Sequence, residues 1–345
     1  MSEAAPARAT DDKLDTSTVG LGLLLVGMAG IATWDQWAIW STKDDYTFGY
    51  LVPIFSGYVL WERWAILRDY LTGRKSHIAE PTSKFILRAM TATGYLSLLM
   101  FGFGGAGRAI FGTGVIPTLL IAFGLLGSAW TFTFLSVRGP DQTEATAHAR
   151  WQAVGLMIFP AGVWIISGPF LYLVDNQIKG QLLSNVTDIV SGILRVTDHV
   201  IRVNGNTIIF ANGDGVGIAD ACSGIRSLSA CVFAGAFLGA TFLEGGFLGA
   251  LLRRTGMILV SGFIAILLNI GRNTFLAFYA LNHGSRSLDR DWSGIEHGQP
   301  NFSAFGSIHD LAGNVAMGLA LLALLACLPL INRIGRGVRS PSSVL

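Results

Sequence analysis

The sequence predicts an all-α polytopic membrane protein with about eight transmembrane helices. The first observation is composition, because 51% of the 345 residues are hydrophobic and only 13% are charged, whereas soluble domains carry about 25% charged residues. The second observation is that the apolar residues gather in runs of about 20, the length that crosses a bilayer as a helix. The third is that lysines and arginines recur between alternate runs. The net charge of +2 does not indicate nucleic-acid binding.

The apolar runs predict a single membrane domain over residues 1–345. The first run ends in Trp34, Trp37 and Trp40, as expected where a helix reaches the membrane interface. It lacks a convincing cleavage site, so we interpret it as a retained span. A short glycine-rich turn is expected after the third run, and Pro160 and Pro169 are expected to kink the fifth. The predicted spans are about 19–40, 49–66, 85–103, 115–137, 151–174, 221–243, 257–279 and 308–330.

The longest segment expected outside the membrane is 175–220, an insertion before the sixth span. Apolar residues recur at helical spacing over about 177–203, which predicts an amphipathic helix lying on the membrane interface. Two β-branched runs follow at 207–210 and 216–218, each after an Asn-Gly pair. That pattern is typical of a small β-hairpin.

The basic residues predict the orientation of the chain. Lysine and arginine accumulate in short cytoplasmic loops, and 62–88, 138–150, 244–254 and 331–345 each carry at least two of them. Both termini are therefore expected in the cytoplasm, with the chain in the cytoplasmic (inner) membrane. This orientation brings the start of span six, the end of span seven and the start of span eight to the extracytoplasmic side. The polar residues at those three points are Cys222, Arg272 and His309.

Cys222 is a candidate nucleophile. A cysteine reacts as its thiolate, and the first turn of a helix favours negative charge. Asp220 is expected to cap that helix, and the small Ser223 would let a peptide approach closely. Arg226, one turn further on, is a weaker supporting candidate. The alternative is that Cys222 is an ordinary buried residue of a membrane helix.

Arg272 and His309 are the candidate partners of Cys222. An arginine within an apolar run is costly and usually functional, so Arg272 is expected to stabilise an oxyanion or to favour the thiolate, with Asn269 orienting it. His309 is a candidate proton carrier, and Asp310 is a candidate for fixing its tautomer. The alternatives are an arginine that snorkels to the interface and a simple interfacial histidine.

No cofactor and no metal are expected. The cysteines form neither a disulfide framework nor a zinc pattern, and Cys231 and Cys327 are expected to be buried residues of spans. His283 and His297 are rival bases in the last outer loop. A metal site formed by these two with His309 stays an alternative, although no tight ligand spacing supports it.

Four segments stand out in order along the chain: Gly49-Tyr50-Leu51-Val52-Pro53 leading to Leu60-Trp61-Glu62-Arg63, Ala221-Cys222-Ser223-Gly224-Ile225, Asn269-Ile270-Gly271-Arg272, and His309-Asp310 with Gly313. Together they resemble the exosortase/archaeosortase family of membrane transpeptidases. Each segment is weak alone, but their order, spacing and shared membrane face make the set specific, and the likeness covers about residues 48–313. Asp220 stands where many relatives have glutamate, which leaves the subfamily open.

The resemblance implies an activity and a site. The family's proposed active site carries over to Cys222, Arg272 and His309. It implies exported substrate proteins that end in a short motif of the PEP-CTERM type, a transmembrane helix and a basic tail. Such a substrate would be cleaved through a thioester that passes to an acceptor amine or to water. The implied partners are these proteins, membrane lipid and an amine acceptor.

Two other functions stay open at this point. One is an intramembrane cysteine protease that hydrolyses and never transfers. The other is a transporter or an assembly component for exopolysaccharide export, in which Arg272 would bind a solute or a lipid headgroup.

Overall fold

A computed structural model gives the fold, and the all-α polytopic membrane architecture is confirmed. Among the described residues, six helices are long and apolar enough to cross a membrane: α1, α3, α4, α5, α8 and α9. The described chain divides into two compact units, treated separately below. The structure describes residues 14–75, 80–140, 143–168, 170–218, 225–243 and 247–333.

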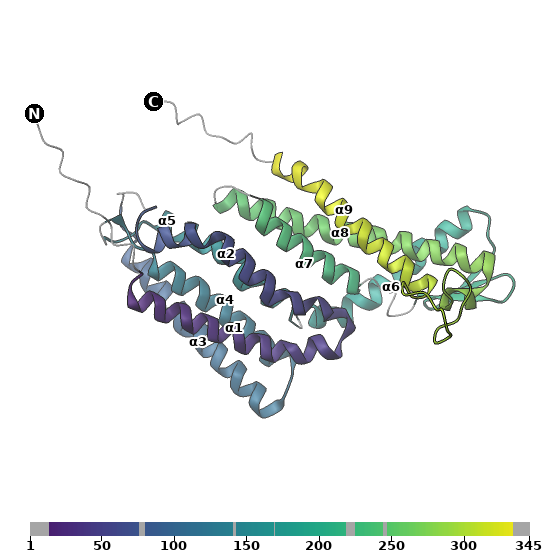
Figure 1. The fold of residues 1–345 in the computed structure, drawn as a ribbon, viewed down its shortest axis with the longest axis horizontal. Helices are drawn as coiled ribbons and strands as arrows, with labels where there is room; N and C mark the ends of the chain where they lie inside the picture. The colour runs from purple at the N-terminus through teal and green to yellow at the C-terminus, as the bar shows by residue number, and fades with distance from the viewer. Residues whose placement is uncertain are drawn as a thin grey trace, which may run out of the picture. The chain divides into compact units, whose positions relative to one another are not determined.

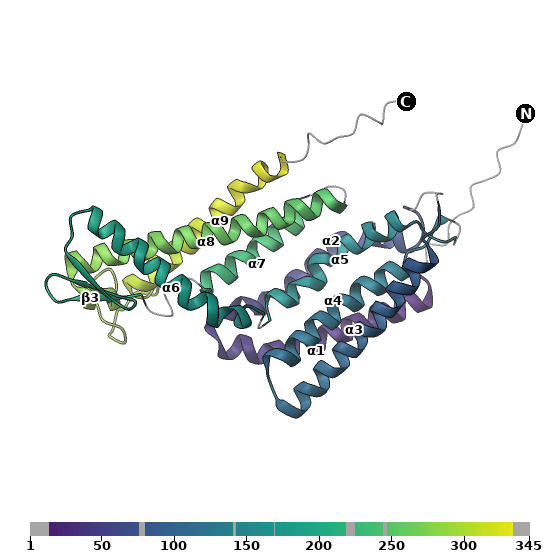
Figure 2. The ribbon, with the colours of Figure 1, turned by 180° about the vertical axis from the view of Figure 1, so that it is seen from behind.

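The first unit is a bundle formed by the first five helices, which lie side by side in both views (Figure 1 and Figure 2). Within it α3 packs on α4, α4 on α5, α2 on α5, and α1 on α4. The short 3-10 helix η1 (Asp44–Leu51) precedes α2. The helices are α1 (Thr16–Thr42), α2 (Val52–Leu71), α3 (Lys84–Phe111), α4 (Val115–Ser136) and α5 (Ala147–Ile166).

The predicted glycine-rich turn after the third span lies further along the chain than expected. Helix α3 continues to Phe111, and the turn is confined to 112–114. Gly104 lies inside α3. A larger residue would not fit there, because α4 passes so close that a Cβ would lie 2.8 Å from the carbonyl oxygen of Pro117. Small residues allow this close approach of membrane helices. Gly104 therefore serves helix packing, and Gly112, with φ +78°, makes the turn.

The fifth span is shorter than predicted, because α5 ends at Ile166 rather than near residue 174. The last carbonyl groups of a helix lack helical partners, and α1 supplies them here. Gln36 Nε2 donates to the carbonyl oxygen of Trp164 at 2.8 Å, and Trp40 Nε1 donates to that of Ser167 at 3.1 Å. Of the two prolines expected to kink this span, Pro160 lies inside α5 and Pro169 lies outside the described residues.

Pro160 links α2 to α5. A proline has no N–H, so the carbonyl four residues earlier loses its helical partner. That carbonyl belongs to Leu156, and Nη1 of the buried Arg63 donates to it at 2.9 Å. Ser56 Oγ donates to the carbonyl oxygen of Pro160 itself at 2.7 Å. Two side chains of α2 thus donate to backbone carbonyl groups of α5 around Pro160.

A buried ion pair joins α1 to α3. Asp35 is fully buried, and its Oδ1 lies 2.8 Å from Nε of Arg108. The Arg108 guanidinium also lies over the Trp34 ring, 4.8 Å from its centroid. A charge buried in a membrane bundle is stable only when it is paired, so this contact fixes α1 against α3.

The second unit combines membrane helices with a small β-sheet. Helix α8 belongs to it from Leu252 onward. Helices α7 and α9 pack on one another, and η4 packs on α9. Its elements are α6 (Phe170–Val196), β1 (Ile201–Asn204), β2 (Thr207–Phe210), β3 (Gly215–Gly217), α7 (Ile225–Phe242), α8 (Phe247–His283), η4 (Ser285–Asp289) and α9 (Ile308–Arg333).

The predicted hairpin is an antiparallel three-stranded sheet in the order β1-β2-β3. The expected amphipathic helix, about 177–203, is α6 and ends earlier, at Val196. Asp198 adopts a left-handed conformation with φ +61°, which stops the helix and frees the following residues to form β1. In β1, Ile201 pairs with Phe210. The strand was missed because its residues also continue the helical spacing of α6.

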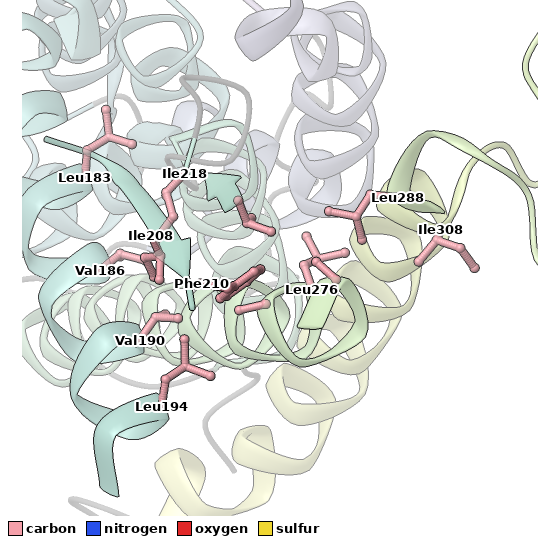
Figure 3. Close-up of a cluster of buried hydrophobic side chains, with 13 residues drawn as sticks. Leu183, Val186, Val190, Leu194, Ile208, Phe210, Ile218, Leu276, Leu288 and Ile308 are labelled. Atoms are coloured by element: carbon pink, nitrogen blue, oxygen red, sulfur yellow. The ribbon is translucent and has the colours of Figure 1, made fainter. Parts of the chain in front are cut away.

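The apolar face of α6 is covered by protein, whereas we expected it to lie on the membrane interface. Figure 3 shows that face beside Ile208 and Phe210 of β2, in one buried cluster that continues through Leu276 of α8 to η4 and the start of α9. The strand offers a second apolar face, and burying the two against each other stabilises both. This core joins the end of α8 to the start of α9. The labelled residues are Leu183, Val186, Val190, Leu194, Ile208, Phe210, Ile218, Leu276, Leu288 and Ile308.

Candidate functional site

Arg272 of α8 and His309 of α9 are in contact. Arg272 Nη2 lies 3.3 Å from Nδ1 and 3.4 Å from Nε2 of His309. The same nitrogen donates to the carbonyl oxygen of His309 at 3.3 Å. The two residues stand next to members of the core just described, since Leu276 follows Arg272 by one helical turn and Ile308 precedes His309. The core therefore sets the spacing of the two helices at this pair.

Gly313 leaves room for the Arg272 side chain. It lies one turn after His309 on α9, and a Cβ built on it would lie 3.5 Å from Nη2 and 3.6 Å from Cζ of Arg272. A Cβ alone would thus meet the guanidinium at van der Waals distance. Any longer side chain would occupy the same space as the arginine.

Two hydrogen-bonding residues fix the start of α9. Ser307 donates from its backbone N at 3.1 Å and from Oγ at 2.9 Å to Oδ2 of Asp310. The N–H of Asp310 donates back to Ser307 Oγ at 3.2 Å. This reciprocal arrangement is a capping box. Asp310 thus supports His309 through the helix cap, and sequence reasoning missed Ser307 although the spacing Ser-x-x-Asp could have revealed it.

The loop before α9 is ordered by a buried carboxylate. Asp291, 3% exposed, accepts hydrogen bonds from the backbone N–H groups of Ser293, Ile295 and Ser303, each at 2.9 Å. Burial opposes the charge, but these N–H groups prevail and lower the pKa of the Asp291 carboxyl. The carbonyl oxygen of the preceding Arg290 accepts from Ile308 N at 2.8 Å. The loop is thereby tied to the first turn of α9.

Asn269 lies beside Arg272 in the protein interior. It is 4% exposed and accepts hydrogen bonds from Nδ2 of Asn273, at its backbone oxygen (2.8 Å) and at Oδ1 (3.2 Å). Asn269 and Arg272 share a small cavity of about 20 Å³ with Cys231 of α7 and Gly313 of α9. The cavity shows that α7, α8 and α9 meet at the Arg272 side chain.

Arg272 also borders a larger groove of about 330 Å³ between α8 and α9. Its walls are apolar apart from the guanidinium, and they include Phe275 from α8 and Leu311 and Val315 from α9. Arg272 Nε is buried and has no hydrogen-bond partner among the residues that the structure describes. The arginine therefore presents its charge between an apolar groove and the small interior cavity.

The other residues singled out in the sequence are placed as follows. Cys222, Asp220 and Ser223 lie outside the described residues, and α7 begins three positions after Cys222, at Ile225. Arg226 is exposed in the first turn of α7. Cys222 is thus the one member of the predicted triad with Arg272 and His309 that has no described geometry.

The remaining cysteines and histidines lie as follows. Cys231 is buried and Cys327 is partly buried. The ring of His283 stacks on Tyr279 at 4.4 Å, and His297 contacts Phe302 edge-on at 5.1 Å. No cluster of three or more His, Cys, Asp or Glu side chains suited to a metal occurs in the part of the chain that the structure describes. Of the histidines considered as bases, His309 has the described contact with Arg272.

The fold and the site define a multi-pass helical membrane protein with an Arg–His pair where two helices leave a shared core. A family model described as transmembrane exosortase matches residues 40–326. Because this match covers well over half of the 345 residues, the chain belongs to the transmembrane exosortase family. No curated protein and no solved structure matches the chain.

Proposed function

We propose that this exosortase is a cysteine transpeptidase that cleaves C-terminal sorting signals of exported proteins at the outer face of the cytoplasmic membrane. The contact between Arg272 and His309 is the observation that carries the proposal, because it joins a cation and a proton carrier from two separate helices. Membership of the exosortase family supports the same reading. Cys222 enters as the nucleophile from its place in the sequence, three residues before α7.

The depth of the pair suits a peptide bond near the membrane surface. Helix α8 has 37 residues, about 55 Å at 1.5 Å per residue, and so exceeds the bilayer core of about 30 Å. Leu276 and Ala280 pack in the core with the β-sheet, which supports α8 leaving the membrane at about this level. Arg272 lies one turn earlier. A scissile bond just outside a substrate's own transmembrane helix would meet it there.

The reaction would proceed in two steps. The Cys222 thiolate attacks the scissile carbonyl carbon, a C–S bond forms, and Arg272 stabilises the negative charge on the carbonyl oxygen. His309 gives a proton to the nitrogen as the C–N bond breaks, and the amine leaves. An acceptor amine or water then attacks the thioester carbon and gives its proton to His309. A C–N or C–O bond forms, the C–S bond breaks, and the Cys222 thiolate leaves.

The orientation belongs to the proposal as well. Basic residues in 62–88, 138–150, 244–254 and 331–345 favour these segments on the cytoplasmic side. Both termini would then be cytoplasmic, and the ends of α8 and α9 that carry Arg272 and His309 would face outward.

The test is co-expression with a tagged protein ending in a short motif, a transmembrane helix and a basic tail. Wild type should process it, and Cys222→Ala should not, while Cys327→Ala, a partly buried cysteine of α9, should process normally. Each variant is checked for membrane insertion and monodispersity in detergent. Persistent processing in Cys222→Ala would exclude this nucleophile, and no processing by the wild type of any such substrate would favour the transport or assembly role.

The mass of the product separates transfer from hydrolysis. A new amine adduct at the cleaved carboxyl end means transpeptidation. A free carboxylate in the presence of amines would instead identify a hydrolytic membrane protease.

A further inference from the structure

A cavity lies in the first unit, whereas Arg272 and His309 belong to the second unit. Its volume is about 430 Å³, and its walls come from α1, α2, α4 and α5. One face of α1, including Gly22, Leu25 and Ala29, forms one side, and Leu60 and Met157 lie opposite. Three of these helices, α1, α4 and α5, are apolar enough to cross a membrane. The cavity is therefore at membrane depth.

The chemistry of the walls suits a hydrocarbon. Most lining side chains are aliphatic. Two polar groups at one end are already used within the protein, because Ser56 Oγ and Trp164 Nε1 both donate to the carbonyl oxygen of Pro160, at 2.7 and 3.1 Å. A molecule bound in the cavity therefore does not need to form hydrogen bonds with these two groups. Empty apolar cavities are costly, and in a membrane the surrounding hydrocarbon is available to fill one.

The size of the cavity distinguishes between two hydrocarbon-rich occupants, a transmembrane helix and a lipid acyl chain. Its lining on α1 runs from Thr18 to Ala29, about 17 Å at 1.5 Å per residue. This is comparable to one leaflet, half of a bilayer core of about 30 Å. Spread over that length, about 430 Å³ is a space narrower than a helix, which is about 10 Å across. The cavity therefore suits a single acyl chain better than a helix.

A cation stands at the end of the cavity where α1 begins. Arg138 Nη2 pairs with Oδ2 of Asp15 at 3.3 Å, and the Arg138 side chain remains 41% exposed. Leu14, next to Asp15, and Ser136, two residues before Arg138, both line the cavity. Asp15 neutralises part of this charge, but the guanidinium has five N–H donors. It is placed to bind a phosphate whose attached chain enters the cavity.

We propose that the first unit holds one membrane phospholipid, with an acyl chain in this cavity and its phosphate bound by Arg138. The site does not depend on the proposed peptidase activity. All of its α1 wall also precedes residue 40, where the family match begins.

The test uses a phosphatidylglycerol that carries a diazirine on its acyl chain, in vesicles containing the full-length protein. Gly22 and Gly20 are a matched pair on α1, because a Cβ on either meets no atom within 4 Å, yet only Gly22 lines the cavity. Photolabelling should mark peptides of α1 and α5 in wild type. It should be lost from them in Gly22→Phe and kept in Gly20→Phe. Equal labelling in both variants, or loss in both, would overturn the proposed acyl-chain site.

The phosphate contact is tested by Arg138→Gln, with Arg74→Gln as a control on another exposed arginine. The matching diacylglycerol probe carries the same chain but no phosphate. Wild type and Arg74→Gln should prefer the phosphatidylglycerol probe, and Arg138→Gln should label equally with both. An unchanged preference in Arg138→Gln would overturn the role of this arginine.

Discussion

Nη2 of Arg272 is nearly equidistant from the two ring nitrogens of His309, at 3.3 and 3.4 Å, and it also donates to the carbonyl oxygen of that residue. The equal distances place the amino group between the two ring nitrogens and not along the lone pair of one of them. One guanidinium therefore contacts both the ring and the backbone of His309. These contacts use one nitrogen of a guanidinium that has five N–H donors. The single ammonium group of a lysine would offer fewer donors, without the fixed planar fork.

Arg272→Lys should lose most activity although it keeps the charge. Removing one preorganised donor from an oxyanion site costs about 10²–10³-fold in rate, and we expect a loss of that order in signal cleavage. Arg253→Lys, on the same helix, is the matched control and should retain activity. Full activity in Arg272→Lys would mean that charge alone suffices, and the geometric role assigned to the guanidinium would be wrong.

Gly313→Leu should also reduce activity, because the added side chain would occupy the space of the Arg272 guanidinium. Gly318→Leu is the control on the same helix, since a Cβ there meets no atom within 4 Å. Cleavage rate and thermal unfolding of both variants are compared. We expect the rate to fall in Gly313→Leu alone. An equal effect of the two variants would point to general disturbance of α9.

Arg63→Met should destabilise the first unit by about 1–3 kcal/mol, the cost of a buried carbonyl without its donor. Pro160→Ala restores an N–H for the carbonyl of Leu156, so the same Arg63→Met change should cost less in that background. A double-mutant cycle of unfolding free energies in detergent measures the difference. Identical costs in the two backgrounds would show that Arg63 does not act through this carbonyl.

The hydrogen bonds that join Asp214 of the β-sheet to Ser285, just after α8, should weaken in acid. The Ser285 hydroxyl, its backbone N–H at 2.7 Å and the Gly215 N–H at 2.9 Å lower the pKa of the Asp214 carboxyl. A lowered folded pKa gives stability that is present above the ordinary value of about 3.9 and is lost as the pH falls through the folded value.

Hydrogen exchange in Gly215–Gly217 and Ser285–Asp289, corrected for intrinsic rates, should therefore be faster near pH 3 than near pH 6. Asp214→Asn, which has no carboxylate to protonate, should show little pH dependence in these segments. The same acid-induced change in Asp214→Asn would assign it to other groups.

The membrane fold was predictable because long apolar runs with few charges form few structures other than membrane-spanning helices. The sequence also predicted that Arg272 and His309 converge, and the structure brings them within 3.3 Å of each other. Their place at the outer membrane surface stays a prediction. Three features were not predictable from local pattern. Gly104 resembles a turn residue until the approach of α4 is known. Strand β1 continues the apolar spacing of α6, and only pairing with β2 makes it a strand.

The third such feature is that the apolar face of α6 is buried in a protein core. Its spacing predicts an amphipathic helix, but the same apolar face fits a membrane surface or a protein core, and only the tertiary structure chooses between them. For the site, Cys222 stays a prediction, because the residues from 219 to 224 lie outside the part of the chain that the structure describes. The Ser307–Asp310 cap was visible in the spacing and was overlooked.

The most direct test of the central claim is to trap the thioester. Purified enzyme in vesicles is mixed with a sorting-signal substrate and quenched, and its peptides are examined by mass spectrometry. We expect an acyl adduct on the peptide that contains Cys222, released by hydroxylamine as the substrate hydroxamate and absent in Cys222→Ala. An adduct on another residue, or cleavage by Cys222→Ala at the wild-type rate, would contradict it.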